Sequence, residues 1–191
     1  MASRLRALRQ AAPEATVELW AEDEHRLGLK PILRRVWAPR GQRPIAPAHH
    51  RYTWTYLYAF VHPERGETAW LLLPRVDAAL FSLALAHFAR DVGAGPTKQI
   101  LLVVDQAGSH IADAVTVPAG IHLEFLPSYS PELQPAERLW PLTNEVVANR
   151  HFADITALED QVAVRCRTLS EQPEVVRSHT RFHWWPTEEA A

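Results

Sequence analysis

The pattern of apolar and polar positions along the chain predicts five strands. Five consecutive large apolar residues at 100–104 predict a strand buried on both faces, because a half-exposed strand would carry a polar residue at every second position. Residues 17–23 alternate apolar and polar for part of their length and form a predicted first strand. Runs rich in aromatic, β-branched and apolar residues predict three more strands at 51–61, 68–73 and 121–126. The turn-like residues between the second and third strands indicate an antiparallel hairpin.

Between the third and fourth strands, helical spacing of apolar residues predicts a helix from Asp77, a capping residue, to about Arg90. Glycines and prolines at 27–43 instead indicate an irregular excursion between the first two strands. The first 16 residues are predicted to be a connector or the end of a helix.

Two further helices are predicted after the fifth strand. One should begin near Pro135 and continue to about Val147, with a kink or restart at Pro141, whose nitrogen carries no hydrogen. The other follows Asp154, where Thr156 and Glu159 have the spacing of a capping box.

Length and composition bound the class of protein. A chain of 191 residues, 47% of them hydrophobic, can bury one substantial core, so we expect residues 17–191 to form one domain. The single cysteine excludes an internal disulfide and is typical of a reducing cytosol. No apolar run approaches the roughly 18 residues of a membrane span, so we expect a cytoplasmic protein without a membrane partner.

Charge is distributed unevenly. Between His25 and Pro63 the chain has seven basic residues and no acidic one, whereas the remainder has 13 basic against 22 acidic residues, a net charge of −9. This segregation favours phosphate binding along one edge of an otherwise acidic body. A solvated basic face without a ligand is the alternative. Candidates for contacts with nucleic acid are Arg34, Arg35, Arg40 and Arg43.

Three acids stand where one crevice could collect them. Asp23 ends the first predicted strand, Asp105 ends the fourth, and Glu137 lies in the first turn of the helix that follows the fifth. The first and fourth strands are neighbours if three antiparallel strands precede a crossover helix, and ligands bind beyond the carboxyl ends of buried strands. Aspartate also commonly ends strands as a turn or cap residue, which is the alternative reading of Asp105.

Neighbouring acids compete for the same role. Glu22, Glu24 and Glu132 are rival ligands, but Glu24 should point to the opposite face of its strand from Asp23, and Glu132 lies in a proline-flanked loop. Three converging carboxylates suit Mg²⁺ or Mn²⁺, which prefer oxygen ligands.

This order of strands is the ribonuclease H-like arrangement, and three sequence blocks carry a family resemblance. They are Ala21-Glu22-Asp23-Glu24-His25-Arg26-Leu27-Gly28-Leu29, Val104-Asp105-Gln106-Ala107-Gly108-Ser109-His110 and the stretch from Leu126 to Trp140, LPSYSPELQPAERLW. Together they resemble the catalytic domain of DDE transposases of the mariner superfamily, specifically the bacterial insertion sequence family 630, over about residues 17–150. The resemblance implies an α/β fold with a mixed five-stranded sheet, three antiparallel strands followed by two parallel ones, flanked by helices.

By this resemblance Asp23, Asp105 and Glu137 match the family's catalytic and metal-binding triad, which holds Mg²⁺ or Mn²⁺, with two ions expected. Two ions about 3.5–4 Å apart can activate a water or a 3′-hydroxyl and stabilise the leaving oxygen of a phosphoryl displacement. The implied activity is DNA strand cleavage and strand transfer, with duplex DNA at transposon ends and targets as the partner. His110 matches a histidine position of the family and is expected to contact substrate phosphate or to orient a carboxylate; a histidine without a role is the alternative.

One departure from the family matters. Mariner-like transposases carry helix-turn-helix DNA-binding modules before the catalytic domain, and this sequence has only about 22 residues before Asp23. We therefore expect recognition of the DNA site to be mostly absent from this chain. A homodimer, a separate DNA-binding subunit or an upstream domain are the possible partners. We expect the protein to act at the nucleoid. Two rival functions remain: a metal-dependent nuclease or resolvase that does not join strands, and a non-catalytic DNA-binding or assembly module derived from a transposase.

Overall fold

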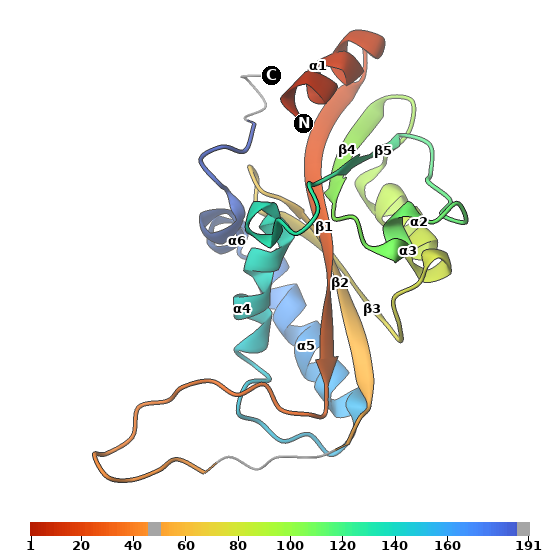
Figure 1. Cartoon of the computed structure of the whole chain (residues 1–191). Helices are drawn as coiled ribbons and strands as arrows, with labels where there is room; N and C mark the ends of the chain where they lie inside the picture. Colours follow the sequence, from red (N-terminus) through yellow and green to blue (C-terminus); the bar gives the residue numbers. More distant parts are fainter. Residues whose placement is uncertain (46–50, 187–191) are drawn as a thin grey trace.

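The protein is built around one five-stranded mixed sheet (Figure 1). The computed structural model describes residues 1–45 and 51–186. The strands lie in the order β3-β2-β1-β4-β5. β1 pairs antiparallel with β2 and parallel with β4, while β3 and β5 complete the two edges. Their bounds are Thr16–Gly28 (β1), Trp54–His62 (β2), Glu67–Leu73 (β3), Lys98–Val104 (β4) and Ile121–Phe125 (β5). The predicted ribonuclease H-like arrangement is confirmed.

Helices cover both faces of this sheet (Figure 1). α2 and α3 lie on one side, and α4, α5 and α6 lie on the other. The helices are α1 (Ala2–Ala11), α2 (Ala78–Val92), α3 (Gly108–Ile111), α4 (Trp140–Asn144), α5 (Ile155–Ser170), α6 (Pro173–Thr180) and two 3₁₀ helices, η1 (Pro131–Leu133) and η2 (Pro135–Leu139).

Alternation of side chains along the central strand places successive residues of β1 in different hydrophobic clusters. On β1, Leu19 and Ala21 pack with residues of η2, α4 and α6, whereas Trp20 packs against Phe81 and Phe88 of α2. Both faces of β4 are buried, as its unbroken apolar run predicts. Residues before and after Trp20 therefore belong to a different layer of the molecule from Trp20 itself.

The predicted helix boundaries hold in part. Asp77 caps α2 and accepts a hydrogen bond from the Leu80 amide at 2.8 Å, as expected. The helix predicted after Asp154 is confirmed: α5 begins at Ile155, and Asp154 caps it by accepting from the Ala157 amide at 2.9 Å. Thr156 lies inside α5 and is not its N-cap. The capping-box prediction is therefore wrong. The segment predicted as a connector or the end of a helix contains the helix α1, whose Leu5 is buried in the core.

The stretch after Pro135 is not one continuous helix. It forms the 3₁₀ helix η2 and then restarts as α4, which confirms the break predicted around Pro141. Trp140 nevertheless has helical angles, φ −62° and ψ −41°, so the usual preference of a residue before proline is overridden here. α4 ends at Asn144 rather than near Val147.

Between β1 and β2 the chain leaves the body of the protein as a long excursion, and we call its described residues, 29–45 and 51–53, the arm (Figure 1). Large apolar side chains are exposed along its described part, Trp37 among them. Within the described ranges, no helix combines the length and apolar character that crossing a membrane requires.

Candidate active site

A cavity of about 360 Å³ opens beside the carboxyl end of β4. Its wall includes all three predicted acids, each supplied by a different element: Asp23 by β1, Asp105 by the residue after β4, and Glu137 by η2. The remaining lining comes from the two loops that follow β4 and β5, namely Gln106, Ala107, Leu126, Pro127, Ser128, Tyr129, Ser130, Pro131 and Gln134. The three acids that the sequence singled out thus share one cavity.

Asp23 lies inside β1 and not at its end, which corrects the sequence-based expectation. β1 continues to Gly28, because residues beyond Asp23 still pair with β2. The pairing with β4 stops at Ala21 opposite Val103, so the side of β1 that faces β4 is uncovered at Asp23. The end of β4, rather than the end of β1, makes room for this carboxylate.

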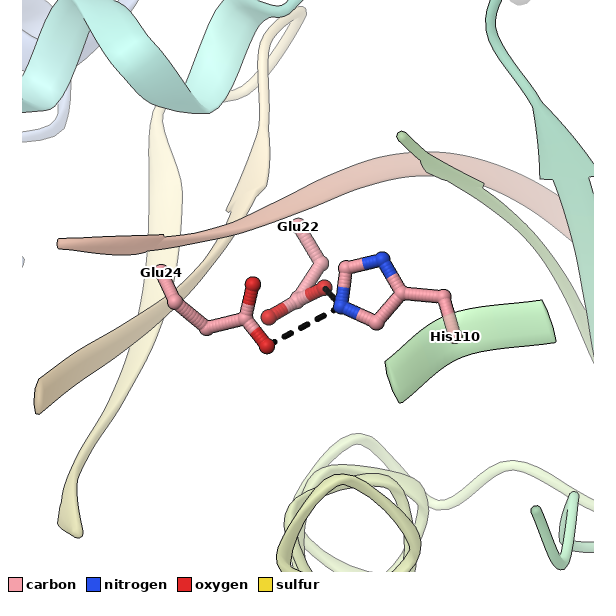
Figure 2. Close-up of side chains that lie close together, drawn as sticks. All are labelled: Glu22, Glu24 and His110. Carbon is pink, nitrogen blue, oxygen red and sulfur yellow. Dashed lines mark hydrogen bonds and ion pairs between the residues drawn. The ribbon is translucent and has the colours of Figure 1, made fainter. Parts of the chain in front are cut away.

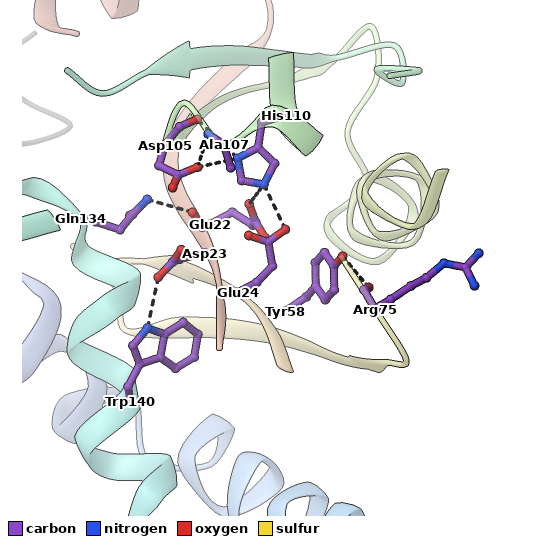
Figure 3. Close-up of polar contacts among 10 residues, drawn as sticks. All are labelled: Glu22, Asp23, Glu24, Tyr58, Arg75, Asp105, Ala107, His110, Gln134 and Trp140. Carbon is purple, nitrogen blue, oxygen red and sulfur yellow. Dashed lines mark hydrogen bonds and ion pairs between the residues drawn. The ribbon is translucent and has the colours of Figure 1, made fainter. Parts of the chain in front are cut away.

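The surroundings of Asp23 disfavour its charge. Burial, followed by the nearby charges of Glu24 and Glu137, raises the pKa of Asp23 to about 7. A hydrogen bond opposes this shift: the indole nitrogen of Trp140 donates to Asp23 Oδ2 at 3.1 Å (Figure 3). A cation in the cavity would relieve the repulsion.

Asp105 is held in the opposite sense. Its Oδ1 lies 2.7 Å from Nδ1 of His110 and accepts a hydrogen bond from the Ala107 amide at 2.9 Å. The hydrogen bond with His110 is the main cause that lowers the pKa of Asp105, against the effect of burial. About half of the side chain is exposed, 51%, so an ionised carboxylate is available to the cavity.

Glu137 is positioned through a buried neighbour that the sequence reading missed. The Gln134 side chain donates a hydrogen bond to the backbone carbonyl of Glu22 at 2.8 Å and so attaches the start of η2 to β1 (Figure 3). Burial, with repulsion from Asp105 and Glu132 and against the attraction of Arg138, raises the pKa of Glu137. A glutamine between two prolines was the available signal, but its partner is a backbone atom that no side-chain pattern reveals.

A second polar cluster lies on the opposite face of β1, formed by Glu22, Glu24 and His110 (Figure 2). One ligand atom from each lies within 4.8 Å of the others. Nε2 of His110 is 3.0 Å from Glu24 Oε1 and 4.0 Å from Glu22 Oε2. The prediction that Glu24 points away from Asp23 is confirmed, and it applies equally to Glu22. The third rival, Glu132, is exposed in η1.

Burial governs the charges of this cluster. It raises the pKa of Glu22 well above its usual range, with a further contribution from the charge of Glu24, and among the described residues neither oxygen of the Glu22 side chain has a hydrogen-bond partner. Burial alone would lower the pKa of His110, but hydrogen bonds to Asp105 and Glu24 outweigh it and raise the pKa to about 11. The predicted contact of His110 with DNA is wrong, because its side chain is fully buried. The other expectation, that it orients a carboxylate, agrees with its contact to Asp105.

The basic candidates Arg34, Arg35, Arg40 and Arg43 are all exposed on the arm. Arg34 lies at its root, where its guanidinium donates to the Pro141 carbonyl and its backbone exchanges two hydrogen bonds of 3.0 Å with the Asn149 side chain. None of the four lines the acidic cavity. Their proposed contacts with DNA therefore belong to a separate surface.

The donor set fits a hard divalent cation. The acids facing the cavity offer oxygen atoms, the ligand type that Mg²⁺ and Mn²⁺ prefer. Two of them, Asp23 and Glu137, have raised pKa values caused partly by other carboxylates, which is the repulsion that a cation removes. A cation bound between these carboxylates would therefore be favoured by the electrostatics of the site.

Comparison with known proteins agrees with this geometry. A relative from Sinorhizobium fredii, the uncharacterised protein y4pE/y4sA, is 33% identical over 132 residues, which is 69% of this chain and 96% of that protein. The Mos1 strand transfer complex shares the fold with a TM-score of 0.54 at 17% identity, covering 95% of this chain and 59% of that one. The Mos1 mariner paired-end complex with Mn does so with a TM-score of 0.53 at 18% identity, covering 94% and 61%.

The chain therefore spans about 60% of the length of these Mos1 chains. The family whose description is DDE superfamily endonuclease matches residues 18–159, a range that contains all three cavity acids and the whole sheet apart from the first two residues of β1. By this match over most of its length, the chain belongs to the DDE superfamily of endonucleases.

Proposed function

We propose that this chain is the catalytic domain of a transposase that cleaves DNA at transposon ends and transfers the cut strand, with Asp23, Asp105 and Glu137 as the ligands of Mg²⁺ or Mn²⁺. One observation carries the proposal: acids from β1, the end of β4 and η2 line the same cavity. It is supported by membership of an endonuclease family and by a fold shared with transposase complexes.

Two divalent ions at this site would supply the Lewis acidity that activates a water or 3′-hydroxyl and stabilises the departing oxygen. The protein's own contribution is to hold the carboxylates in place. Asp105 is kept ionised by His110, Trp140 favours the charged form of Asp23, and Gln134 fixes η2 and with it Glu137. The reacting phosphate would lie in the cavity while the exposed arginines of the arm bind the flanking backbone.

The arginines of the arm can bind phosphates without reading base sequence. We therefore propose that an upstream domain or a separate subunit recognises the transposon end, and that two copies of this chain can act together. The site of action would be cellular DNA, at the nucleoid in the cytoplasm.

Cleavage of a labelled duplex in Mn²⁺ tests the proposal. Asp105→Asn and Glu137→Gln should each abolish cleavage. Glu137→Gln should retain the fold, since it removes an acid that other carboxylates repel. Asp105→Asn also removes the charge that pairs with His110, so thermal unfolding must establish that this variant is folded. Glu132→Gln is the matched control, because Glu132 is an exposed acid of the neighbouring 3₁₀ helix. Cleavage by either of the first two variants at the wild-type rate would refute the assignment of the triad.

The rival function is a nuclease on the same fold, which hydrolyses DNA without joining strands. A duplex that already carries a free 3′-hydroxyl at the transposon end separates the two. Joining of that end to a second duplex supports the transposase, and hydrolysis alone supports the nuclease.

A further inference from the structure

We propose that His110 is a positioning residue that fixes the carboxylate of Asp105 in the cavity by bracing it against Glu24 on β1. The inference rests on the proposed function, because it concerns how one of the proposed metal ligands is held. It gives two residues of the buried cluster of Glu22, Glu24 and His110, namely Glu24 and His110, a role in positioning Asp105.

The imidazole ring of His110 is held on three sides. Nδ1 lies 2.7 Å from Oδ1 of Asp105, and Nε2 lies 3.0 Å from Oε1 of Glu24 (Figure 3). The ring also packs on Phe81 of α2, with 4.3 Å between ring centroids. A fully buried ring with both nitrogens engaged has no freedom to rotate, so it can act as a rigid spacer between the two carboxylates.

Asp105 needs such a support because it lies just beyond β4, where the strand pairing ends. Half of its side chain is exposed, and the other contact to Oδ1 comes from the Ala107 amide in the same loop. With Oδ1 held by these two donors, Oδ2 is the oxygen left for a cation. A ligand fixed within about 0.5 Å of its working position binds metal without first losing conformational freedom.

The brace ends on the same strand that carries the first acid of the cavity. Glu24 follows Asp23 directly, and the two side chains lie on opposite faces of β1. His110 therefore links Asp105 to β1, the strand that also carries Asp23. The distance between the two proposed ligands then depends on β1 and on the imidazole ring of His110, and not on the backbone of the loop after β4 alone.

Two substitutions of similar size separate the two halves of the brace. The amide nitrogen of asparagine can occupy the place of Nδ1, so His110→Asn retains a donor to Asp105 but does not reach Glu24. The amide nitrogen of glutamine reaches the place of Nε2, so His110→Gln retains a donor to Glu24 but not to Asp105. Both leave a buried polar side chain of comparable volume, so general destabilisation should be alike.

The measurement is Mn²⁺ binding to the metal-free domain by calorimetry, with thermal unfolding to establish that each variant is folded. We expect the Kd for Mn²⁺ to rise at least tenfold in His110→Gln and clearly less in His110→Asn. His122→Gln is the control, since His122 of β5 bonds to Gln99 and does not line the cavity. Equal affinities of wild type and His110→Gln, in variants that are folded, would overturn the proposal.

A second pair keeps the proposal testable if the His110 variants do not fold. Glu24→Gln retains an oxygen that can accept from Nε2, whereas Glu24→Leu has none, so Mn²⁺ affinity should be weakened more by leucine. Equal affinity in the two folded Glu24 variants would count against the brace. If instead Asp105→Asn binds Mn²⁺ as tightly as wild type, the proposed function fails; loss of binding in Asp105→Asn with full binding in His110→Gln means that only the brace fails.

A competing outcome is a cation held by Glu22, Glu24 and His110 themselves, whose ligand atoms gather within 4.8 Å. Binding of Mn²⁺ that survives Asp105→Asn and Glu137→Gln but disappears in Glu22→Gln would establish that site and overturn the brace. The proposal predicts that Glu22→Gln leaves binding dependent on Asp105.

Discussion

Trp140 donates its indole hydrogen to Asp23 while its ring stacks on the imidazole of His25, with 4.8 Å between the ring centroids and 15° between their planes. The hydrogen bond to Asp23 is an electrostatic contact and the stack on His25 is a packing contact, and both connect α4 to β1. The two effects can be separated, because phenylalanine can stack but cannot donate a hydrogen bond.

Trp140→Phe should raise the pKa of Asp23 above its value of about 7, because the hydrogen bond that favours the charged form is removed. Since Asp23 must ionise to bind a cation, Mn²⁺ affinity measured against pH should shift to higher pH in the variant. Trp37→Phe, on the exposed arm, is the control. Superimposable pH profiles for Trp140→Phe and wild type would show that the indole has no electrostatic role.

Asp23→Asn should stabilise the metal-free protein at pH 8 and have little effect near pH 4. The folded-state pKa of Asp23 is about 7, above its usual value, so its favourable contribution is complete below about pH 4 and is lost as pH rises through 7. The gain at pH 8 should be on the order of 2 kcal/mol, given about 1.4 kcal/mol per pKa unit and partial relaxation. Urea unfolding at both pH values measures it, with exposed Asp113→Asn as the control. A variant that is less stable than wild type at pH 8 would contradict this origin of the raised pKa.

Gln134→Ala should destabilise the protein by about 1–3 kcal/mol, because the buried carbonyl of Glu22 loses its hydrogen-bond donor. Cleavage should fall by more than stability explains, since η2 and Glu137 lose their attachment to β1. Urea unfolding and cleavage rates of the folded fraction test both statements. Gln42→Ala, exposed on the arm, provides the matched control. If the unfolding free energy of Gln134→Ala lies within about 0.5 kcal/mol of wild type, roughly the scatter of surface substitutions, the hydrogen bond from Gln134 to Glu22 does not stabilise the fold.

Arg35→Ala combined with Arg40→Ala should weaken binding to transposon-end and random duplexes equally, because phosphate contacts carry no base sequence. The slope of log affinity against log salt should become shallower by about 0.9 for each phosphate that the variant no longer neutralises. Titration of both duplexes at two salt concentrations, beside exposed Arg6→Ala, measures this. A preference of more than about tenfold for the end sequence would show that the chain reads bases itself.

The pattern of apolar residues was enough to predict most of the sheet, since β4 and the hairpin of β2 and β3 follow directly from apolar runs. It failed at the end of β1, where five polar residues in a row suggested that the strand was over, although pairing with β2 continues through them. Burial of charged groups depends on partners remote in sequence, and Glu24 and His110 are 86 positions apart. α6 was missed for a related reason: Val176 is its one fully buried apolar side chain, so its pattern is faint.

Residues of the candidate site could be predicted from the sequence where they end a strand or begin a helix. Asp105 and Glu137 could be placed by those rules, and Asp23 reached the same cavity for a different reason, the early end of β4. Trp140 and Gln134 could not be found, because their contacts to β1 depend on how η2 lies across the sheet.

The alternation of side chains along β1 has a consequence for how such a gene can change. Glu22, Asp23 and Glu24 are three acids in a row, yet one faces the cavity and two face His110. Loss of a single codon between Val17 and Ala21 would shift one half of the strand against the other by one residue and exchange their faces. Either the apolar residues would leave the core, or an acid with a longer side chain would enter the cavity. In this stretch the number of residues should therefore be inherited as strictly as the acids themselves, and variation should proceed by substitution and not by insertion or deletion.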